Sequence, residues 1–305
     1  VNRFAKELAD AIAGLRPVKS GAVRINGVET TNNSPRDSRT AGLAYVPEEA
    51  LLASVPANAG DSWESTNPAL AGRAFRLCRN YREHQTCNWA IAATDDHAYC
   101  RSCRLTRVIP DVADPDQRAA WHRLELAKRR LVFTLLAFGL PVVSRDDDPV
   151  SGLAFEFKAD PVEPGAPRVF TGHSEGVITV NLAEADDPER ERRRLGLGEP
   201  YRTLLGHMRH ESGHYYWSTL VKDTAVIEDY RRLFGDERRD YPGALEQHYA
   251  QGPPGDWPSR YVSAYASAHP WEDWAETWAH YLHMVDALET AGSNGLVLKP
   301  RRTDE

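Results

Sequence analysis

The chain has 305 residues, of which 41% are hydrophobic, and its formal net charge at pH 7 is −7. This length and hydrophobic content are enough to bury a core in one large or two smaller domains. The negative charge argues against a general nucleic-acid binder, since such proteins usually carry a basic surface. The sequence shows no signal peptide and no long apolar run, which predicts a cytoplasmic location and no membrane partner.

Residues 1–50 contain two recognisable strings, ELADAIAGLRPVKSGAVRINGV and SPRDSRTAGLAYVPEE. Through these strings the segment resembles an internal stretch of the ATP-binding subunits of sugar-type ABC transporters. It lacks the phosphate-binding loop G-x-x-x-x-G-K-[ST], so we expect it neither to bind nor to hydrolyse ATP. We therefore expect residues 1–50 to be a non-functional fragment of that module.

All four cysteines follow a small, polar linker at residues 55–72, and they are spaced C-x8-C-x12-C-x2-C. The last pair forms a tight CRSC knuckle of the kind that wraps a tetrahedral metal ion. The pattern predicts a closed structural zinc site with four thiolate ligands: Cys78, Cys87, Cys100 and Cys103. Two disulfides are the alternative, which a reducing cytoplasm disfavours.

Arginines are concentrated around the cysteine knuckle. Such a cluster is compatible with a nucleic-acid contact, but we favour a solvated basic surface as its interpretation. The residues concerned are Arg76, Arg79, Arg82, Arg101, Arg104 and Arg107.

Helix and strand signals follow the cysteine segment. Residues 117–140 predict an amphipathic helix that is closed by Pro141. Alternation over residues 153–159 predicts a strand, and two further strand signals begin at Arg168 and Gly176 and are expected to form a hairpin. The edge of such a sheet can pair with an extended peptide substrate, and plain sheet is the alternative.

The most informative motif is HESGH, which spans His210 to His214. In a helix, two histidines four residues apart share one face and can bind one metal ion. Glu211 is then placed to accept a proton from metal-bound water. Gly213 predicts a close backbone approach to the metal or to a strand. A core helix with two structural histidines is the alternative. Apolar residues at helical spacing are expected on its buried stripe: Leu204, Met208, Tyr215 and Val221.

A catalytic zinc site needs a third protein ligand, and a helix that begins at Pro270 and ends near Gly292 is its best source. We predict Glu272 as the ligand and Glu276 as the carboxylate that orients a ligating histidine. The reverse assignment is an alternative, as are carboxylates stabilised only by the helix dipole. Beside them runs a predicted core stripe: Trp271, Trp274, Trp278, Tyr281, Val285 and Leu288.

Other polar residues near the motif are harder to assign. We interpret His207 and His280 as supporting or ordinary polar residues rather than as ligands. Three phenols are candidates for stabilising an oxyanion, and no spacing selects one of them: Tyr261, Tyr265 and Tyr281.

Several long strings across the chain are typical of one family. They are CNWAI at Cys87, CRSCRLTRVIPD at Cys100, TGHSEGVITVNLAEADD at Thr171, GEPYRTLLGHMRHESGHYYW at Gly198 and SAYASAHPWEDWAETWAHYLH at Ser263. Residues 44–296 thereby resemble the bacterial zinc-binding metallopeptidases that carry a zinc ribbon ahead of the peptidase domain. The resemblance implies a zincin-like domain with His210, His214 and a glutamate on zinc. The string EDWAE matches the E-x-x-A-[DEN] pattern of glutamate-class zincins with Glu272 first.

These observations predict an α+β fold, in which a small four-cysteine zinc module precedes a zincin-like domain with an active-site helix and a small sheet. The expected boundaries are 1–50 for the transporter-like fragment, 51–112 for the linker and zinc module, and 113–305 for the peptidase domain. We expect one structural and one catalytic zinc and a peptide or protein substrate, with Glu211 as general base. A zinc-stabilised protein- or nucleic-acid-binding regulator without turnover is the alternative.

Overall fold

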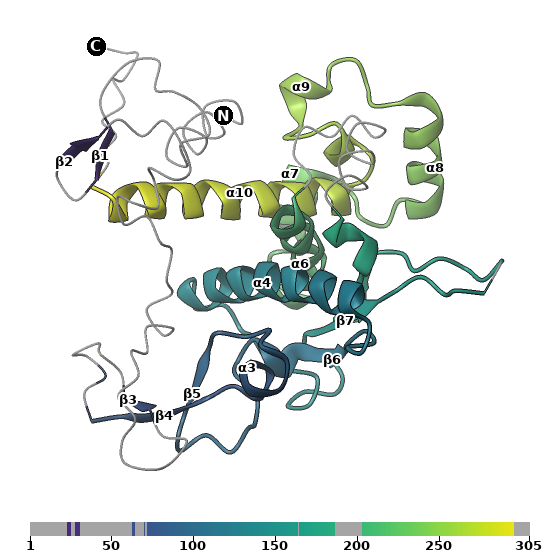
Figure 1. The fold of residues 1–305 in the computed structure, drawn as a ribbon. Coiled ribbons are helices and arrows are strands. Elements are labelled where there is room, and N and C mark those ends of the chain that lie inside the picture. The colour runs from purple at the N-terminus through teal and green to yellow at the C-terminus, as the bar shows by residue number, and fades with distance from the viewer. Residues whose placement is uncertain are drawn as a thin grey trace. The chain divides into compact units, whose positions relative to one another are not determined.

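The computed structural model describes residues 23–25, 28–30, 63–64, 70, 72–163, 165–186 and 203–295 (Figure 1). The predictions for the linker and for most of residues 1–50 lie outside the described residues. Among the residues that are described, no helix combines the length and the apolar character that crossing a membrane requires.

The chain divides into two compact units, residues 1–46 with 280–305, and residues 47–279. In the first unit, β1 (Val23–Ile25) pairs with β2 (Val28–Thr30) as an antiparallel hairpin. The long helix α10 (Pro270–Ser293) begins in the second unit and ends in the first. All of the other described elements belong to the second unit.

The second unit begins with the cysteine module, an antiparallel sheet in the order β3-β4-β5. Its elements are β3 (Trp63–Glu64), β4 (Ala74–Leu77), α3 (Arg79–His84), β5 (Ala90–Ala92) and the 3-10 turn η3 (Cys103–Leu105). Cys78 lies between β4 and α3, and Cys103 opens η3. The short elements therefore bring cysteines that are distant in sequence to one end of the module.

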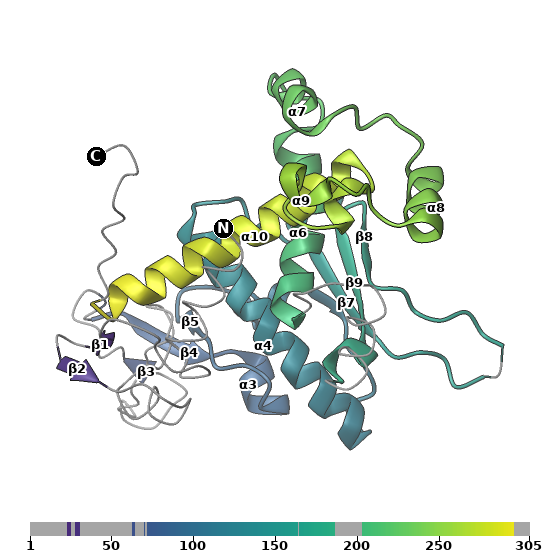
Figure 2. The same ribbon diagram turned by 90° about the horizontal axis from the view of Figure 1, so that it is seen from above.

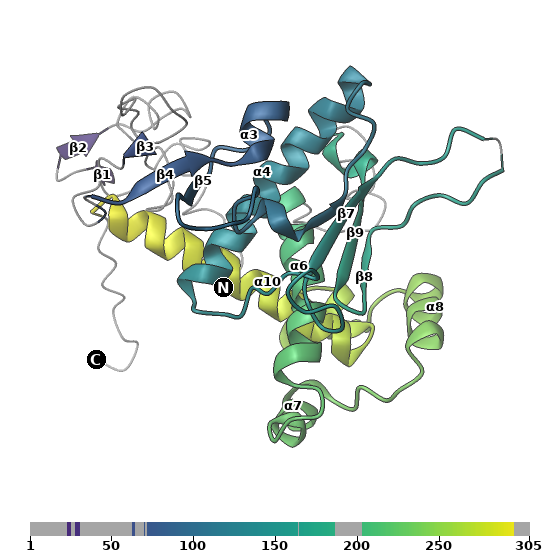
Figure 3. The same cartoon turned by 90° about the horizontal axis from the view of Figure 1, so that it is seen from below.

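A four-stranded sheet with the order β6-β7-β9-β8 follows the module (Figure 3). Its strands are β6 (Thr106–Val108), β7 (Ala154–Lys158), β8 (Gly172–Ser174) and β9 (Val177–Asn181). β6, β7 and β9 are parallel, whereas β8 runs antiparallel to β9 at the edge of the sheet. The predicted strand at 153–159 and the predicted hairpin are both confirmed, although the first hairpin strand begins at Gly172 rather than at Arg168. Glu175 and Gly176 both have positive φ, as a two-residue hairpin turn requires.

Two long helices pack together beside this sheet, α4 (Pro115–Ala137) and α6 (Leu204–Leu220) (Figure 2). The predicted helix at 117–140 begins two residues earlier because Asp114 accepts hydrogen bonds from two backbone amides of the first turn. Fully buried side chains of α4, β7 and β9 form the core: Trp121, Leu124, Leu131, Leu135, Phe155, Phe157 and Ile178. The mixed helix and sheet architecture, with the cysteine module ahead of the histidine-bearing helix, confirms the predicted α+β class.

Shorter helices connect α6 to α10. They are α7 (Ile227–Phe234), α8 (Tyr241–Gln251), α9 (Trp257–Arg260) and the 3-10 turn η5 (Tyr265–Ser267); a further 3-10 turn, η4 (Leu182–Ala185), follows β9. The first turn of α10 is fixed by His269, whose Nδ1 accepts a hydrogen bond from the backbone amide of Trp271. Pro270 at its first position has no amide hydrogen to satisfy.

Helix α10 crosses α6 at the HESGH motif (Figure 1). A Cβ atom added at Gly213 would lie 2.9 Å from the Cα atom of Ala275, so only glycine permits this approach. Trp274 and Trp278 donate hydrogen bonds to the carbonyl of Gly213 and the hydroxyl of Ser212. Gly213 therefore allows α6 to approach the helix α10 closely. The predicted close approach to the metal or to a strand is wrong.

The predicted core stripes are only partly confirmed. On α6, Met208, Tyr215 and Val221 are buried, but Leu204 is only half-buried. On α10, Tyr281 and Leu288 are exposed, and the fully buried positions include Glu272, Ala275 and Ala279 instead. The buried face is displaced because close packing against Gly213 requires alanine, which leaves the tryptophans at the sides of the contact.

Replacing Gly213 with alanine should destabilise the protein by about 1–3 kcal/mol. The added methyl group overlaps the backbone of α10, and this strain outweighs the gain of about 1 kcal/mol that alanine brings to a helix. Thermal unfolding of the variant measures the effect. Gly292→Ala is the matched control, because a Cβ atom there has no neighbour within 4 Å and should be neutral or mildly stabilising. Equal stability of the Gly213→Ala variant and wild type would contradict the close approach.

Candidate active site and metal centres

Three side chains converge at the crossing of α6 and α10. Nε2 of His210 lies 3.2 Å from Nε2 of His214 and 3.0 Å from Oε2 of Glu272, and the third distance, from His214 Nε2 to Glu272 Oε2, is 3.7 Å. The two histidines lie on one face of α6 because they are four residues apart. The glutamate comes from the first turn of α10 and is almost fully buried.

These distances fit the ligand set of a tetrahedral zinc ion. Bonds of about 2.0–2.1 Å from zinc to nitrogen or oxygen place neighbouring ligand atoms about 3.4 Å apart. Glu272 Oε2 is buried and has no well-aligned hydrogen-bond partner, although two imidazole nitrogens lie close to it. The three atoms therefore lie close enough together to share one metal ion, and two histidines with one carboxylate are a donor set that zinc accepts.

Contacts outside this triad hold its side chains in place. Nδ1 of His210 donates a hydrogen bond of 2.7 Å to Oε1 of Glu276, which leaves the lone pair of Nε2 free for a metal ion. The hydroxyl of Tyr241 donates a hydrogen bond of 2.6 Å to Oε1 of Glu272, which directs the other carboxylate oxygen towards the histidines. Glu276 thus contacts the histidine that the sequence analysis expected it to orient.

Glu211, the carboxylate of the motif, is connected to a buried chain of charged groups. Its Oε1 lies 3.3 Å from Nε2 of His207, and Nδ1 of the same imidazole lies 3.5 Å from Oε2 of Glu184 in η4. Glu184 and Glu211 are both buried. His207 therefore lies between two carboxylates and restrains the orientation of Glu211.

The protonation states of these groups follow from burial and from their neighbours. Burial opposes ionisation of Glu211, but His207 and the other imidazoles outweigh it and lower the pKa of this carboxyl to about 2. Burial likewise opposes the charge on His207, yet Glu184 and Glu211 raise its pKa to about 9. Burial would also raise the pKa of Glu272, but the contacts with His210 and His214 hold it well below the ordinary value. Both carboxylates are therefore ionised at neutral pH.

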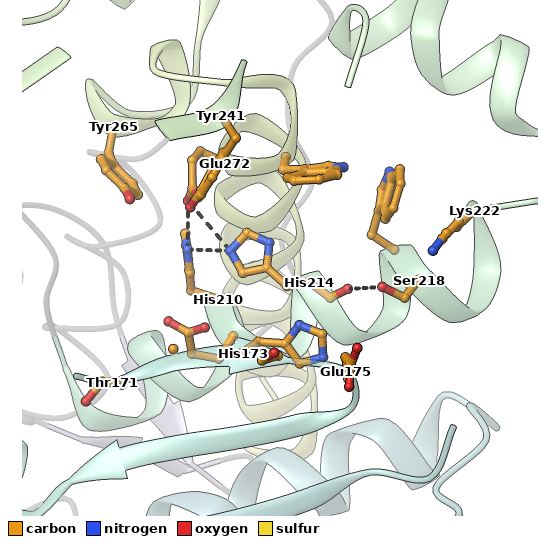
Figure 4. Close-up of a pocket in the computed structure, with 15 residues that line it drawn as sticks. Thr171, His173, Glu175, His210, His214, Ser218, Lys222, Tyr241, Tyr265 and Glu272 are labelled. Carbon is orange, nitrogen blue, oxygen red and sulfur yellow. Dashed lines mark hydrogen bonds and ion pairs between the residues drawn. The ribbon is translucent and has the colours of Figure 1, made fainter. Parts of the chain in front are cut away.

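A cavity of about 400 Å³ opens in front of the triad (Figure 4). The edge strand β8 forms one wall through residues 171–175, and α6 forms another through His210, His214 and Ser218. His173 of β8 stacks beside His214, with 6.4 Å between the ring centroids, and its Nε2 accepts a hydrogen bond from the backbone amide of Gly176. Burial and the neighbouring His214 lower the pKa of His173 to about 4, so this imidazole is neutral at pH 7.

The four cysteines form a second candidate metal centre. Their sulfur atoms lie within 4.8 Å of one another, all four residues are buried, and none forms a disulfide. Cys87 Sγ and Cys100 Sγ are 3.7 Å apart, close to the roughly 3.8 Å expected between thiolates on a tetrahedral zinc with bonds of about 2.3 Å. Backbone amides donate to three of the sulfurs, which favours thiolates: Trp89 to Cys87, Cys100 to Cys78, and Cys103 to Cys100. The alternative of two disulfides is wrong.

Buried polar contacts connect α4 to the cysteine module and to the strand β6 that follows it. Lys128 forms a fully buried ion pair of 2.9 Å with Glu125, and both contact the hydroxyl of Thr106. Arg129 donates a hydrogen bond of 2.5 Å to the carbonyl oxygen of Thr86. These bonds couple the order of the module to the core of the histidine-bearing part of the chain.

Several of the arginines around the knuckle make contacts within the module. Arg76 donates to the carbonyl of His97, and Arg79 forms an ion pair with Glu83. Arg104 pairs with Asp95, at 2.8 Å. Their charges therefore have structural partners inside the module.

Sequence reasoning identified most of the residues that the structure brings together. His210, His214 and Glu272 converge, Glu276 contacts His210, and the four cysteines cluster. Among the three candidate tyrosines, Tyr265 lines the cavity. Residues that the sequence analysis did not assign to the site are Tyr241, His173 and Glu184, which come from α8, β8 and η4 and have no fixed spacing to the motif.

Comparison with known proteins identifies relatives of the chain. Two are uncharacterized proteins of Mycobacterium tuberculosis and Mycobacterium bovis, each 47% identical over 222 residues, which are 72% of this chain and 64% of the relative. The chain thus spans less than two thirds of the length of these relatives. A short stretch of 44 residues, 14% of this chain and 8% of the relative, is 48% identical to a glucose import ATP-binding protein of Haloferax volcanii. No solved structure matches the chain.

Two family models match consecutive parts of the sequence. A zinc-ribbon domain matches residues 32–114, which include the four cysteines. The family described as "Putative zinc-binding metallo-peptidase" matches residues 117–304, which include HESGH and the glutamates of α10. The second match covers more than half of the chain and contains the cluster of His210, His214 and Glu272, whereas the first match contains the four-cysteine cluster. The chain belongs to this family of zinc-binding metallo-peptidases and carries a zinc-ribbon domain ahead of the peptidase region.

Proposed function

We propose that the protein is a zinc-dependent peptidase, with His210, His214 and Glu272 as the ligands of its catalytic zinc. The observation that supports this most directly is the convergence of Nε2, Nε2 and Oε2 of these residues within one cavity. When bound, zinc supplies a Lewis acid that polarises a carbonyl group and lowers the pKa of a water molecule towards neutrality.

Glu211 acts as the general base in this proposal. Its carboxylate lines the cavity and is ionised at neutral pH, so it can accept a proton from water and pass it to the leaving amine. His207 keeps the carboxylate in one orientation through its contacts with Glu211 and Glu184. His210 is held by Glu276, and Glu272 by Tyr241, so these two side chains of the centre each have a neighbour that limits their rotation.

The substrate in this proposal is an extended peptide that pairs with β8. This strand lies at the edge of its sheet, and its residues line the same cavity as the ligand triad. A peptide can add to such an edge through main-chain hydrogen bonds, which position a scissile bond without reading its side chains. Tyr265 also lines the cavity and is the phenol placed to stabilise an oxyanion.

The four cysteines hold a second zinc with a structural role in the same proposal. The four cysteines are buried, and four thiolates fill all the coordination positions of a tetrahedral zinc ion, so none is left for a substrate. By ordering the cysteine module, this zinc would also hold in place Thr86 and Thr106, which Arg129 and Lys128 of α4 contact.

Hydrolysis of a peptide library by zinc-loaded protein tests the proposal. Mass spectrometry should detect cleavage products that disappear after treatment with a zinc chelator and return when zinc is restored. The control is the same cycle on the Glu211→Gln variant, which should show no products at any stage. Cleavage that persists after the chelator has removed all zinc would contradict the proposed chemistry.

Replacing Glu276 with alanine should weaken zinc binding at the catalytic site by about 10–100-fold without abolishing it, because the residue orients His210 rather than binding metal itself. Competition with a chromogenic chelator measures the affinity. Asp286→Ala, which removes a carboxylate elsewhere on α10, should leave the affinity unchanged. Complete loss of catalytic zinc in the Glu276→Ala variant would instead make Glu276 a ligand.

A further inference from the structure

A second cavity adjoins the candidate active site just beyond the end of α6. Its volume is about 340 Å³, and it shares Trp217, Lys222 and Trp271 with the first cavity. Since the two cavities share three lining residues, they lie next to each other, and we refer to the two together as the groove. A peptide that places its scissile bond at the zinc ligands therefore has room for further residues in the second cavity.

One face of α6 leads from the metal ligands to this second cavity. His210, His214, Ser218 and Lys222 follow one another at intervals of four residues, and all four line the first cavity (Figure 4). Lys222 lies two residues beyond the last residue of α6 and eight residues beyond His214, which at the rise of a helix corresponds to about 12 Å. An extended peptide advances about 3.3 Å per residue, so Lys222 is about three or four residues from the scissile bond.

The cations that line the second cavity differ in whether they have an ion-pair partner. Arg231 is held by Glu237 at 2.6 Å and by Glu228 at 2.7 Å, and so its charge is compensated. Arg238, which also lines the cavity, pairs with its near neighbour Asp236.

The remaining charged residues of the cavity are two cations and one carboxylate, Lys222, Arg239 and Asp223. Lys222 and Arg239 are exposed, and no acidic side chain in the described ranges forms an ion pair with either of them. These two cations therefore line the cavity without an ion-pair partner in the described ranges. A carboxylate is the ligand that pairs with such cations.

We propose that the outer part of this groove, at Lys222 and Arg239, binds a carboxylate of the peptide substrate three or four residues from the scissile bond. The carboxylate comes either from an aspartate or glutamate side chain or from the free C-terminus of the peptide, and both sources present the same group to the two cations. The proposal rests on the proposed function for the location of the scissile bond. The presence of the two cations, Lys222 and Arg239, in the groove does not depend on that function.

Calorimetric titration of zinc-loaded Glu211→Gln protein, full chain, measures binding without cleavage. The probes are octapeptides in matched pairs, with glutamate or glutamine at the third or fourth residue on either side of the centre, and with a free or amidated C-terminus. At least one acidic member should bind about fivefold tighter than its neutral partner at low salt, and 0.5 M sodium chloride should largely remove the difference. The pair that shows the difference identifies the source of the carboxylate.

Charge reversal locates the contact. Lys222→Glu with Arg239→Glu, introduced in the same background, should abolish the preference or invert it in favour of lysine-containing peptides. Arg232→Glu is the control, since it reverses one charge on an exposed residue outside both cavities and should preserve the preference. Lys222→Arg should also preserve it.

The outcomes separate this inference from the proposed function. Equal binding within every pair, no binding of any acidic peptide, or a preference that survives the double reversal would overturn the carboxylate site. A salt-sensitive preference that the double reversal removes, in a protein that hydrolyses no peptide, would support the site and count against the peptidase. Hydrolysis of peptides with no preference for acidic ones would support the peptidase and count against the carboxylate site.

Discussion

The Glu211→Gln variant should lose peptidase activity by at least about 10²–10⁴-fold while it keeps its catalytic zinc. Glutamine has nearly the same shape as glutamate but cannot accept a proton, and general base catalysis contributes an effect of this size. The three proposed ligands are unchanged in this variant, since Glu211 contacts His207 and not the metal triad. Initial rates on a cleavable peptide, together with zinc content, measure both parts of the result.

The matched control is Glu246→Gln, the same chemical change on an exposed residue of α8 that does not line the cavity. Its activity should equal that of wild type. Retained activity in a highly purified Glu211→Gln preparation would refute the role of the carboxylate as general base. Loss of zinc together with activity would mean that Glu211 supports the metal centre instead.

The Cys100→Ala variant should lose the structural zinc and much of the stability of the cysteine module. Structural zinc contributes about 10–16 kcal/mol of apparent binding free energy in small zinc-finger peptides, and this free energy is available to the folded state alone. Because Cys100 is buried and lies beside Cys87, its loss leaves three thiols without a complete ligand set. Limited proteolysis should cut within residues 72–110, and the melting temperature should fall by several degrees or more.

Ser102→Ala is the control for this substitution. Ser102 belongs to the same knuckle and is buried, but its hydroxyl has no hydrogen-bond partner among the described residues. Removing that hydroxyl should leave zinc content and melting temperature unchanged or slightly raised, since no bond is lost. A Cys100→Ala variant that melts like wild type and resists the protease equally would contradict a structural role for this metal centre.

Some parts of the site could be predicted because helical geometry is local. Two histidines at a spacing of four share one face of a helix whatever its surroundings, so the pairing of His210 with His214 follows from the motif alone. Glu272 could be proposed because a carboxylate in the first turn of a Trp-rich helix needs a partner when it is buried. Its contacts with both histidines agree with that reasoning.

Other parts depend on tertiary contacts that leave no periodic signal. Tyr241 reaches Glu272 from α8, 31 residues away in sequence, and His173 reaches His214 from the edge strand. Spacing within one helix says nothing about either contact. The prediction that Tyr281 belongs to the buried stripe of α10 was wrong for a related reason. The sequence pattern shows which residues are apolar, but not that α6 approaches α10 so closely at Gly213 that an alanine, Ala275, must face it.

We expect the chain to hold two separate zinc ions, one at His210, His214 and Glu272 and one at the four cysteines. Elemental analysis of zinc per chain in wild type, Glu272→Ala and Cys100→Ala distinguishes the two sites. We predict two zinc ions in wild type and one in each variant, with activity lost in Glu272→Ala. A wild type with a single zinc, or a Glu272→Ala variant that keeps both, would refute this assignment of the two sites.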